Sequence, residues 1–385
     1  ASLLAACAGE SDTPRASRTT DLRVIATTAM VGDVIATLGG EHFAVETLLG
    51  SGVDPHLYRP NRDDVARLMG ADLVVASGLH LEGRMGDTLA GLATDTRRVV
   101  AFAELLLGES DPTLALLGDP DAPEGTESRE GAAHTNYDPH AWMDPLRWAR
   151  AAELLAPTLV ELAPATHRDE VQRDVLESAL PSFRATAEAL VAFGNACFGT
   201  IPKKQRVLVT AHDAFRYMGE RFGLEVLGLQ GLSTESEAGM RRIEELVDLL
   251  VVRRIPAVFV ESSVSDRAVK ALVQGALARG HEVVIGGELF SDAMGKPGTY
   301  EGTYVGMIAH NITTITRGLG GRVPGGSFDI WRSVALDAPR WDALDRDTAA
   351  RTWPKNPPAD GQVEALDTAL MGGSSRNAAA TPKED

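Results

Sequence analysis

Short β-branched apolar runs alternate with helical patterns along most of this chain, and that alternation limits its fold more than any other feature. DLRVIATTAM, which begins at Asp21, FAVETLLG and ADLVVASG have the composition of strands. VGDVIATLGG, closed by glycines, and NRDDVARLMG, with an Asn cap at its start, have helical patterns instead. Because strands that alternate with helices pair in parallel, the pattern predicts an α/β fold.

The same alternation resumes after residue 200. RVLVTAHDAFRYMGERFG predicts a strand, a loop and a helix, IPAVFVESS and HEVVIGGELFSDAMG predict strands, and TYVGMIAHNITTITRGLGG predicts a closing helix. Between the two series lies a long amphipathic segment, Arg168 to Phe198, in which Pro181 should kink or restart the helix. We therefore expect two lobes, each a mostly parallel sheet flanked by helices, bridged by one long rigid helix.

A length of 385 residues also favours more than one domain. Residues 118–137 are rich in Gly, Pro and polar residues and predict a loop. The last residues, GGSSRNAAATPKED, predict disorder and suggest no role. We expect a truncated signal and tether, an N-terminal lobe, a linking helix, a C-terminal lobe and a mostly disordered extension, at residues 1–20, 21–165, 166–199, 200–319 and 320–385.

Composition excludes several classes of protein. The formal net charge is −17, and an acidic protein repels nucleic-acid phosphates, so we expect no nucleic-acid partner. The chain has two cysteines, Cys7 and Cys197, which are too few for a disulfide scaffold or a cysteine-based zinc site. We interpret Cys197 as an inert residue of a helix. No apolar run reaches the roughly 18 residues that a transmembrane helix requires.

The first residues, ASLLAACAGES, contain a match to the cleavage box of bacterial lipoproteins. In that box, small residues precede a cysteine that becomes the lipidated first residue, and here Leu4 to Ala6 precede Cys7. Because six residues precede Cys7 in this sequence, we interpret the segment as a truncated signal, with a chance match in an Ala-rich leader as the alternative. The small polar residues up to Thr20 suit a flexible tether to a lipid anchor.

An Asp-Pro-His frame occurs twice, in GVDPHLYRP and in YDPHAWMDP. Proline fixes its own backbone and restricts the residue before it, so each frame aims the histidine that follows it. These histidines are His56 and His140, each with an aromatic residue two positions later. A histidine held in this way is what a metal site or a catalytic site needs.

Two further residues follow predicted strands of the second series. His212 comes after RVLVT, and Asp292 lies in the loop after HEVVIGGELF. Ligands of α/β proteins bind near such loops, so His56, His140, His212 and Asp292 are candidate ligands of one site. Three imidazoles and one carboxylate suit a divalent first-row cation such as Zn²⁺ or Mn²⁺. Four protein ligands would leave no position for a reactive water, which favours binding or carriage over catalysis.

Each candidate also has an ordinary interpretation. A histidine after a strand is commonly a satisfied loop residue, and Asp292 could cap a helix. The other histidines lack the frame, and we interpret them as surface or packing residues: His42, His80, His134, His167, His281 and His310. His134, in the polar loop, could also capture metal loosely. Four acids flank the candidates and could accept a ring N–H or instead form caps and turns: Asp54, Asp138, Asp144 and Asp213.

At these motifs the sequence resembles the metal-binding lipoproteins and periplasmic proteins that deliver zinc or manganese to ABC transporters, and is most similar to the TroA type. The resemblance covers about residues 22–319 and includes both frames, GADLVVASGLHLEG, VLVTAHDAFRYMGERFGLEVLGLQGLSTESEAG and IPAVFVESS. It implies two α/β lobes on one rigid helix, a small structural change on metal loss, and ligands at His56, His140, His212 and Asp292.

The resemblance leaves the metal open. Members with Glu at the third ligand position resemble dedicated manganese binders, and this chain has His212 there. Zinc-specific members often carry a long His-rich acidic loop before the second ligand, whereas this loop is acidic with His134 as its one histidine. The general order of affinities favours Zn²⁺ over Mn²⁺ in vitro.

We therefore expect a monomeric, lipid-anchored, extracytoplasmic receptor that captures Zn²⁺ or Mn²⁺ between its lobes and passes it to a membrane ABC permease. It is not expected to be an enzyme. One alternative is a metallohydrolase that uses the same cluster with Glu288 or Glu301 as general base. The other is a surface adhesin in which the metal is structural.

Overall fold

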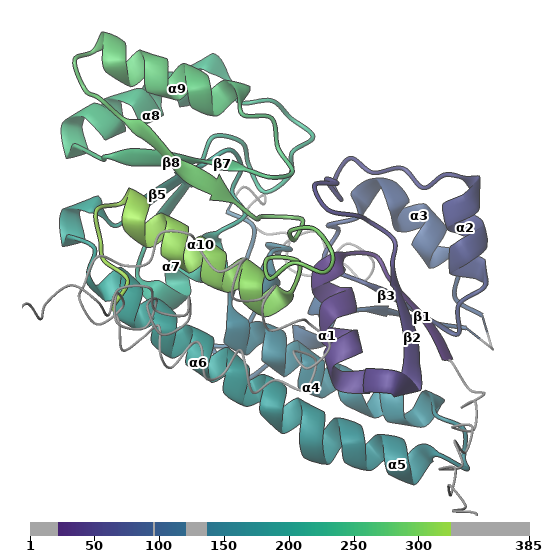
Figure 1. The fold of residues 1–385 in the computed structure, drawn as a ribbon. Coiled ribbons are helices and arrows are strands. Elements are labelled where there is room, and N and C mark those ends of the chain that lie inside the picture. The colour runs from purple at the N-terminus through teal and green to yellow at the C-terminus, as the bar shows by residue number, and fades with distance from the viewer. Residues whose placement is uncertain (1–21, 95–96, 121–136, 325–385) are drawn as a thin grey trace, which may run out of the picture.

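A computed structural model describes residues 22–94, 97–120 and 137–324. The N-terminal lobe is built on a sheet of four parallel strands in the order β2-β1-β3-β4, as predicted for an α/β fold (Figure 1). These strands are β1 (Leu22–Ala26), β2 (Phe43–Thr47), β3 (Leu73–Ala76) and β4 (Arg98–Ala101). The helices between them are α1 (Ala29–Gly39), α2 (Arg62–Met69) and α3 (Gly86–Ala90).

Helix α2 shows how the local sequence sets an element in this lobe. The Asn61 side chain accepts the backbone N–H groups of Asp63 and Asp64, and the Asp64 carboxylate accepts the N–H of Asn61. This capping box confirms the predicted Asn cap and satisfies backbone donors that have no partner within the helix. It also ends the loop that carries His56, so that loop is held at β2 on one side and at α2 on the other.

The C-terminal lobe repeats the alternation with a difference in its sheet. Strands β5 (Val207–Thr210) and β6 (Glu225–Gly228) form one parallel pair, and β7 (Ala257–Glu261) and β8 (Val284–Leu289) form another. Strands β5 and β7 lie side by side, but within the described residues no ladder joins the two pairs. The helices of this lobe are α7 (Arg216–Phe222), α8 (Met240–Arg253), α9 (Arg267–Ala278) and α10 (Tyr304–Gly318).

A long helical run connects the lobes, as predicted. It comprises α5 (Arg168–Gln172), a π-helical segment (Arg173–Ala179) and α6 (Leu180–Gly199), and α4 (Pro145–Leu162) packs beside α6. Pro181 lies in the first turn of α6. Because proline cannot donate to the carbonyl four residues earlier, the wider π turn before it accommodates the ring, and the hydrogen-bond pattern restarts at Leu180 while the backbone stays helical.

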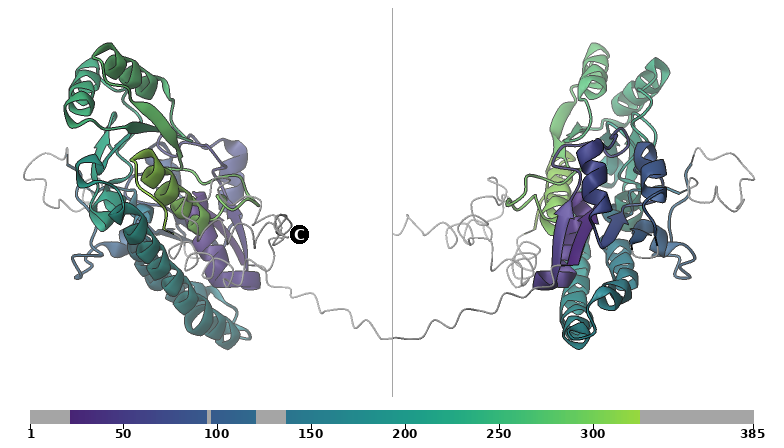
Figure 2. Two further views of the ribbon diagram at one scale, coloured as in Figure 1. Left: turned by 60° about the vertical axis from the view of Figure 1, so that its left-hand side comes forward. Right: turned by 90° about the vertical axis from the view of Figure 1, so that its right-hand side faces the viewer.

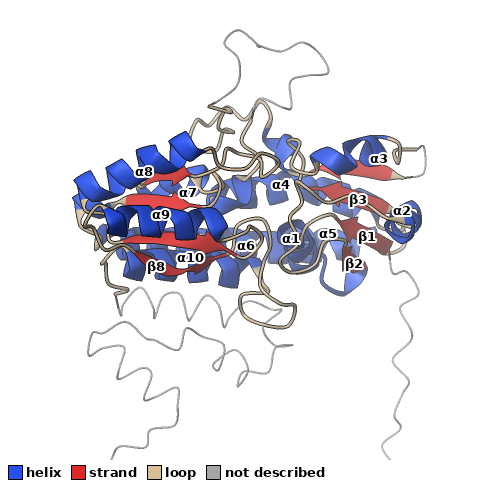
Figure 3. Cartoon of the chain, turned by 90° about the horizontal axis from the view of Figure 1, so that it is seen from above, coloured by secondary structure: helices blue, strands red, loops and turns tan. Residues whose placement is uncertain are grey.

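One hydrophobic core continues through both lobes and the helices beneath them. Figure 2 shows the long helical run along the base of the molecule, and Figure 3 shows the two groups of strands with loops between them. Trp142 and Trp148 are fully buried, and Tyr304 of α10 stacks near Trp148 with ring centroids 6.4 Å apart. Since the lobes share this core, wide hinge opening would expose it and is disfavoured.

Short 3₁₀ turns complete the described elements, at Gly40–His42, Gly83–Met85, Ala103–Leu106, Ala141–Met143 and Lys203–Gln205. Cys197 is buried in α6, and burial raises the pKa of its thiol to about 12, which fits the predicted inert role. Nowhere in residues 22–94, 97–120 or 137–324 is a helix both long and apolar enough to cross a membrane. Cys7 with the tether, His134 and residues 325–385 lie outside the described residues.

Candidate metal centre

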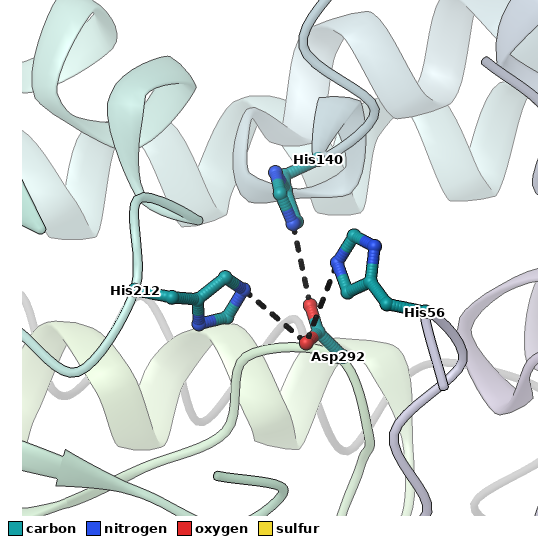
Figure 4. Close-up of side chains that lie close together, drawn as sticks. All are labelled: His56, His140, His212 and Asp292. Carbon is teal, nitrogen blue, oxygen red and sulfur yellow. Dashed lines mark ion pairs between the residues drawn. The ribbon is translucent and has the colours of Figure 1, made fainter. Parts of the chain in front are cut away.

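The structure brings the four candidate ligands together from four loops. His56 lies in the loop after β2, His140 precedes the 3₁₀ turn Ala141–Met143, His212 follows β5, and Asp292 follows β8. The carboxyl ends of the parallel strands of both lobes therefore supply three of the loops, where α/β folds place ligands. Figure 4 shows the three imidazoles pointing toward the carboxylate of Asp292.

The ligand atoms are close and buried. The Nε2 atoms of His212 and His56 lie 3.2 Å and 3.9 Å from Asp292 Oδ2, and the Nε2 atom of His140 lies 3.4 Å from Asp292 Oδ1. One ligand atom from each of the four residues lies within 4.8 Å of all the others. None of the four residues is more than 5% exposed. The cluster is compact enough for one ion to contact all four side chains.

These inward-facing atoms lack other partners. The Nε2 atoms of the three histidines and both carboxylate oxygens of Asp292 are buried with no hydrogen-bond partner among the described residues. An unsatisfied buried polar atom costs free energy, and such atoms are rare unless something compensates them. Five of them facing one another are what a site built for a cation would show, because each lone pair can become a metal ligand.

In both Asp-Pro-His frames, the aspartate accepts a hydrogen bond from the backbone of the histidine two residues later. Asp54 Oδ1 accepts the backbone N–H of His56 at 2.8 Å, and Asp138 Oδ1 accepts that of His140 at 3.0 Å. Each aspartate thus closes a tight turn onto the histidine two residues later. Asp138 Oδ1 also lies 2.7 Å from Nδ1 of His140 and accepts the ring proton there, which leaves Nε2 for the site.

Sequence reasoning missed the residue that orients His212. Glu261 at the end of β7 accepts the backbone N–H of His212 at 2.9 Å and bonds its Nδ1 atom at 2.6 Å. This carboxylate sets the ring so that Nε2 faces Asp292. The sequence shows an acidic residue at the end of the apolar run IPAVFV, but nothing in it pairs that residue with His212.

The remaining flanking acids do not hold a ligand ring. Asp144 instead caps α4 through the N–H of Leu146 and pairs with Arg147 and Arg221, so its role is to anchor this segment to α7. Asp213 bonds no imidazole, and burial together with the charge of Asp138 raises its pKa to about 6.

Burial and charge shift the pKa values of the ligands in different directions. Burial lowers the pKa of His56 to about 3. Burial also disfavours the charged form of His140, but Asp138 and Asp292 outweigh it and raise that pKa to about 9. Asp292 and Glu261 likewise raise the pKa of His212 against burial, while the histidines hold the pKa of Asp292 well below its usual range. Without metal, His140 and His212 therefore carry protons that a cation must displace.

The other described histidines lie elsewhere, as predicted. Three form hydrogen bonds with ordinary partners: His42 with Asp174, His281 with the carbonyl of Ile255, and His310 with the carbonyl of Glu288. His167 lies 3.7 Å from the carboxylate of Glu170. His80 lines a pocket of about 310 Å³ beside the cluster. Of the four cluster residues, His56 is the one that also lines this pocket.

The chain matches a family model described as zinc-uptake complex component A, periplasmic, over residues 24–318. It is 42% identical to the manganese-binding lipoprotein MntA of Bacillus subtilis over 77% of this chain and 90% of that protein. It is 38% identical to the zinc-binding protein TroA of Treponema pallidum over 77% of this chain and 88% of that protein. A solved structure of the T. pallidum protein superposes with a TM-score of 0.66 over 78% of this chain and 99% of that one.

Proposed function

This chain belongs to the family of zinc-uptake complex component A periplasmic proteins, and we propose that it is the extracytoplasmic substrate-binding protein of an ABC transporter. It captures one Zn²⁺ or Mn²⁺ ion between its lobes and delivers it to a membrane permease. The convergence of five buried, unpartnered polar atoms on one point carries this proposal. Three imidazole nitrogens and one carboxylate are ligands that both ions accept.

Each ligand has a defined part in the proposed site. His56 reaches the ion from the N-terminal lobe, and His212 and Asp292 reach it from the C-terminal lobe. His140 also reaches the ion from the N-terminal lobe, with its ring held by Asp138. Cys7 would carry the lipid anchor, and the chain would act as a monomer.

Two relatives bear on the choice of metal. The B. subtilis relative is described as manganese-binding and the T. pallidum relative as zinc-binding, so the family includes both. The site of this chain has three nitrogen donors, which suit zinc well. We propose that zinc binds more tightly in vitro and that the cellular supply decides which ion is carried.

The metallohydrolase alternative is less well supported. Glu288, one suggested general base, is exposed on β8, and neither Glu288 nor Glu301 belongs to the four-residue cluster. Four protein ligands also leave no obvious position for an attacking water. Nothing in the described ranges specifically favours the adhesin alternative, in which the metal is structural.

Uptake in the host cell tests the transport function. Deleting the gene should slow accumulation of radioactive zinc or manganese when free metal is scarce, because capture from dilute solution is lost. The wild-type chain should restore uptake, and Asp292→Ala should not. Glu288→Gln is the matched control, since it changes an exposed carboxylate near the same strand end, and it should restore uptake fully. Full restoration by Asp292→Ala would overturn the assignment.

A further inference from the structure

Three of the four ligands are held by contacts deep in the molecule. The indole N–H of Trp142 donates to the carbonyl of Ser291 at 3.0 Å, which ties the segment of His140 to the loop of Asp292. The hydroxyl of Tyr304 donates to the carbonyl of Trp142 at 2.8 Å. Glu261 holds His212 through both its backbone and its ring. These contacts are buried, so the three ligands form one rigid group.

His56 is held differently. Its Nε2 atom lies 3.9 Å from Asp292, the longest of the three histidine distances, and its neighbour Leu57 is 41% exposed. Its backbone is fixed by Asp54 Oδ1, as described above. The other oxygen, Asp54 Oδ2, accepts the hydroxyl proton of Thr234 at 2.6 Å. Thr234 belongs to the loop between β6 and α8 in the opposite lobe, and it is 8% exposed.

The two aspartates of the repeated frames therefore differ in what supports them. Asp138 bonds both the backbone and the ring of its own histidine, and Tyr217 donates to its backbone carbonyl. One carboxylate oxygen of Asp54 accepts the backbone N–H of His56, and the other accepts the hydroxyl proton of Thr234. The turn that positions His56 thus depends on a carboxylate shared with Thr234 of the other lobe, whereas Asp138 also holds the ring of its own histidine directly.

On the basis of the proposed function, we propose that Thr234 is a positioning residue that latches the His56 loop closed and thereby sets the rate at which metal leaves. Breaking the bond frees the Asp54 carboxylate, which lets the turn that aims His56 relax. His56 lines the pocket of about 310 Å³, and Leu232, Ser233 and Glu235 beside Thr234 line it too. Withdrawal of His56 would thus open the site toward that pocket, with the other three ligands still in place.

A second contact joins the Thr234 loop to the N-terminal lobe, at the 3₁₀ turn Gly83–Met85 instead of the His56 loop, and serves as a comparison. Arg84 and Glu235 form an ion pair with a 2.8 Å N–O distance, and their side chains are 35% and 50% exposed. Exposed ion pairs contribute little because water screens them and ordering the side chains costs entropy. The part-buried hydroxyl-to-carboxylate bond of Thr234 should therefore dominate, since hydrogen bonds to charged groups are the stronger kind.

The test measures metal dissociation from the full chain loaded with one equivalent of zinc and mixed with excess chelator. Thr234→Val keeps the shape of the side chain and removes the donor, and it should speed dissociation by about 10- to 100-fold. Thr234→Ser keeps the hydroxyl and should stay within about twofold of wild type. Arg84→Gln should also change the rate by less than about threefold. Thermal unfolding of each metal-free variant establishes that it is folded.

The outcomes separate this proposal from the proposed function. Fast release from Thr234→Val with slow release from Thr234→Ser supports the latch. Wild-type release from Thr234→Val overturns it, as does equally fast release from the Ser variant, which would assign the effect to packing. An Arg84→Gln effect as large as that of Thr234→Val also overturns it. If Thr234→Val does not fold, Thr234→Ala takes its place; it should also release metal about 10- to 100-fold faster, and wild-type release from it overturns the latch. A wild-type chain that takes up no metal would instead refute the proposed function.

Discussion

Replacing His140 by alanine is expected to weaken Zn²⁺ binding by more than about 100-fold and to leave the chain folded. Replacing a residue that only orients a ligand typically lowers metal affinity by about 10- to 100-fold, so loss of a direct ligand should lower it further. Folding should survive because Asp138 still accepts the backbone N–H of residue 140. Competitive titration against a chromophoric chelator measures the affinity.

His167→Ala is the matched control for this experiment. His167 is about half exposed near the start of α5, where it faces Glu170 and takes no part in the cluster. Its replacement should leave the affinity unchanged. If His140→Ala binds zinc as tightly as wild type does, His140 is not a ligand and the site has been assigned wrongly.

Metal affinity is expected to fall steeply as the pH drops from about 9 toward 6. The pKa of His140 is raised to about 9 and that of His212 lies well above its usual value. Without metal, both rings are therefore imidazolium cations at neutral pH, with a proton on each ring nitrogen. Metal binding must displace one proton from each ring, and every proton released changes the affinity about tenfold per pH unit. His56, with a pKa of about 3, is already neutral and adds nothing to this dependence.

The sign of this dependence follows from which form binds. Only the neutral imidazole offers a lone pair to the metal, so a raised pKa penalises binding below that pKa and the penalty disappears above it. Asp292 stays ionised over the whole range because its pKa is well below the usual value. Titrations at several pH values, with correction for proton binding by the chelator, measure the slope. An affinity that does not change between pH 7.5 and 5.5 would count against a histidine site.

The sequence predicted the four candidate ligands, but it did not predict the residues that hold them in place. His56, His140, His212 and Asp292 each follow a strand or a rigid turn, and such local patterns are readable without long-range information. Glu261 was missed because its partner, His212, is 49 residues away and nothing local marks the contact. Thr234 escaped notice for the same reason, since its partner Asp54 is 180 residues away.

The fold shows the same division between local and long-range information. The strand and helix alternation predicted the α/β lobes and the long helix, because periodicity is a local property. It could not predict that the strands of the C-terminal lobe form two separate pairs, since pairing depends on contacts between distant segments. Nor could it reveal that Asp144 pairs with Arg147 of α4 and Arg221 of α7 and does not accept a ring N–H from a ligand.

The most direct test of this account is the metal content of the purified chain after saturation with zinc and removal of free metal. The account predicts one zinc ion per wild-type chain and none in Asp292→Ala, because that carboxylate faces all three imidazoles. A wild-type chain that retains no stoichiometric zinc or manganese would contradict it. The family membership would then describe the fold alone, and the convergence of the four side chains would need another explanation.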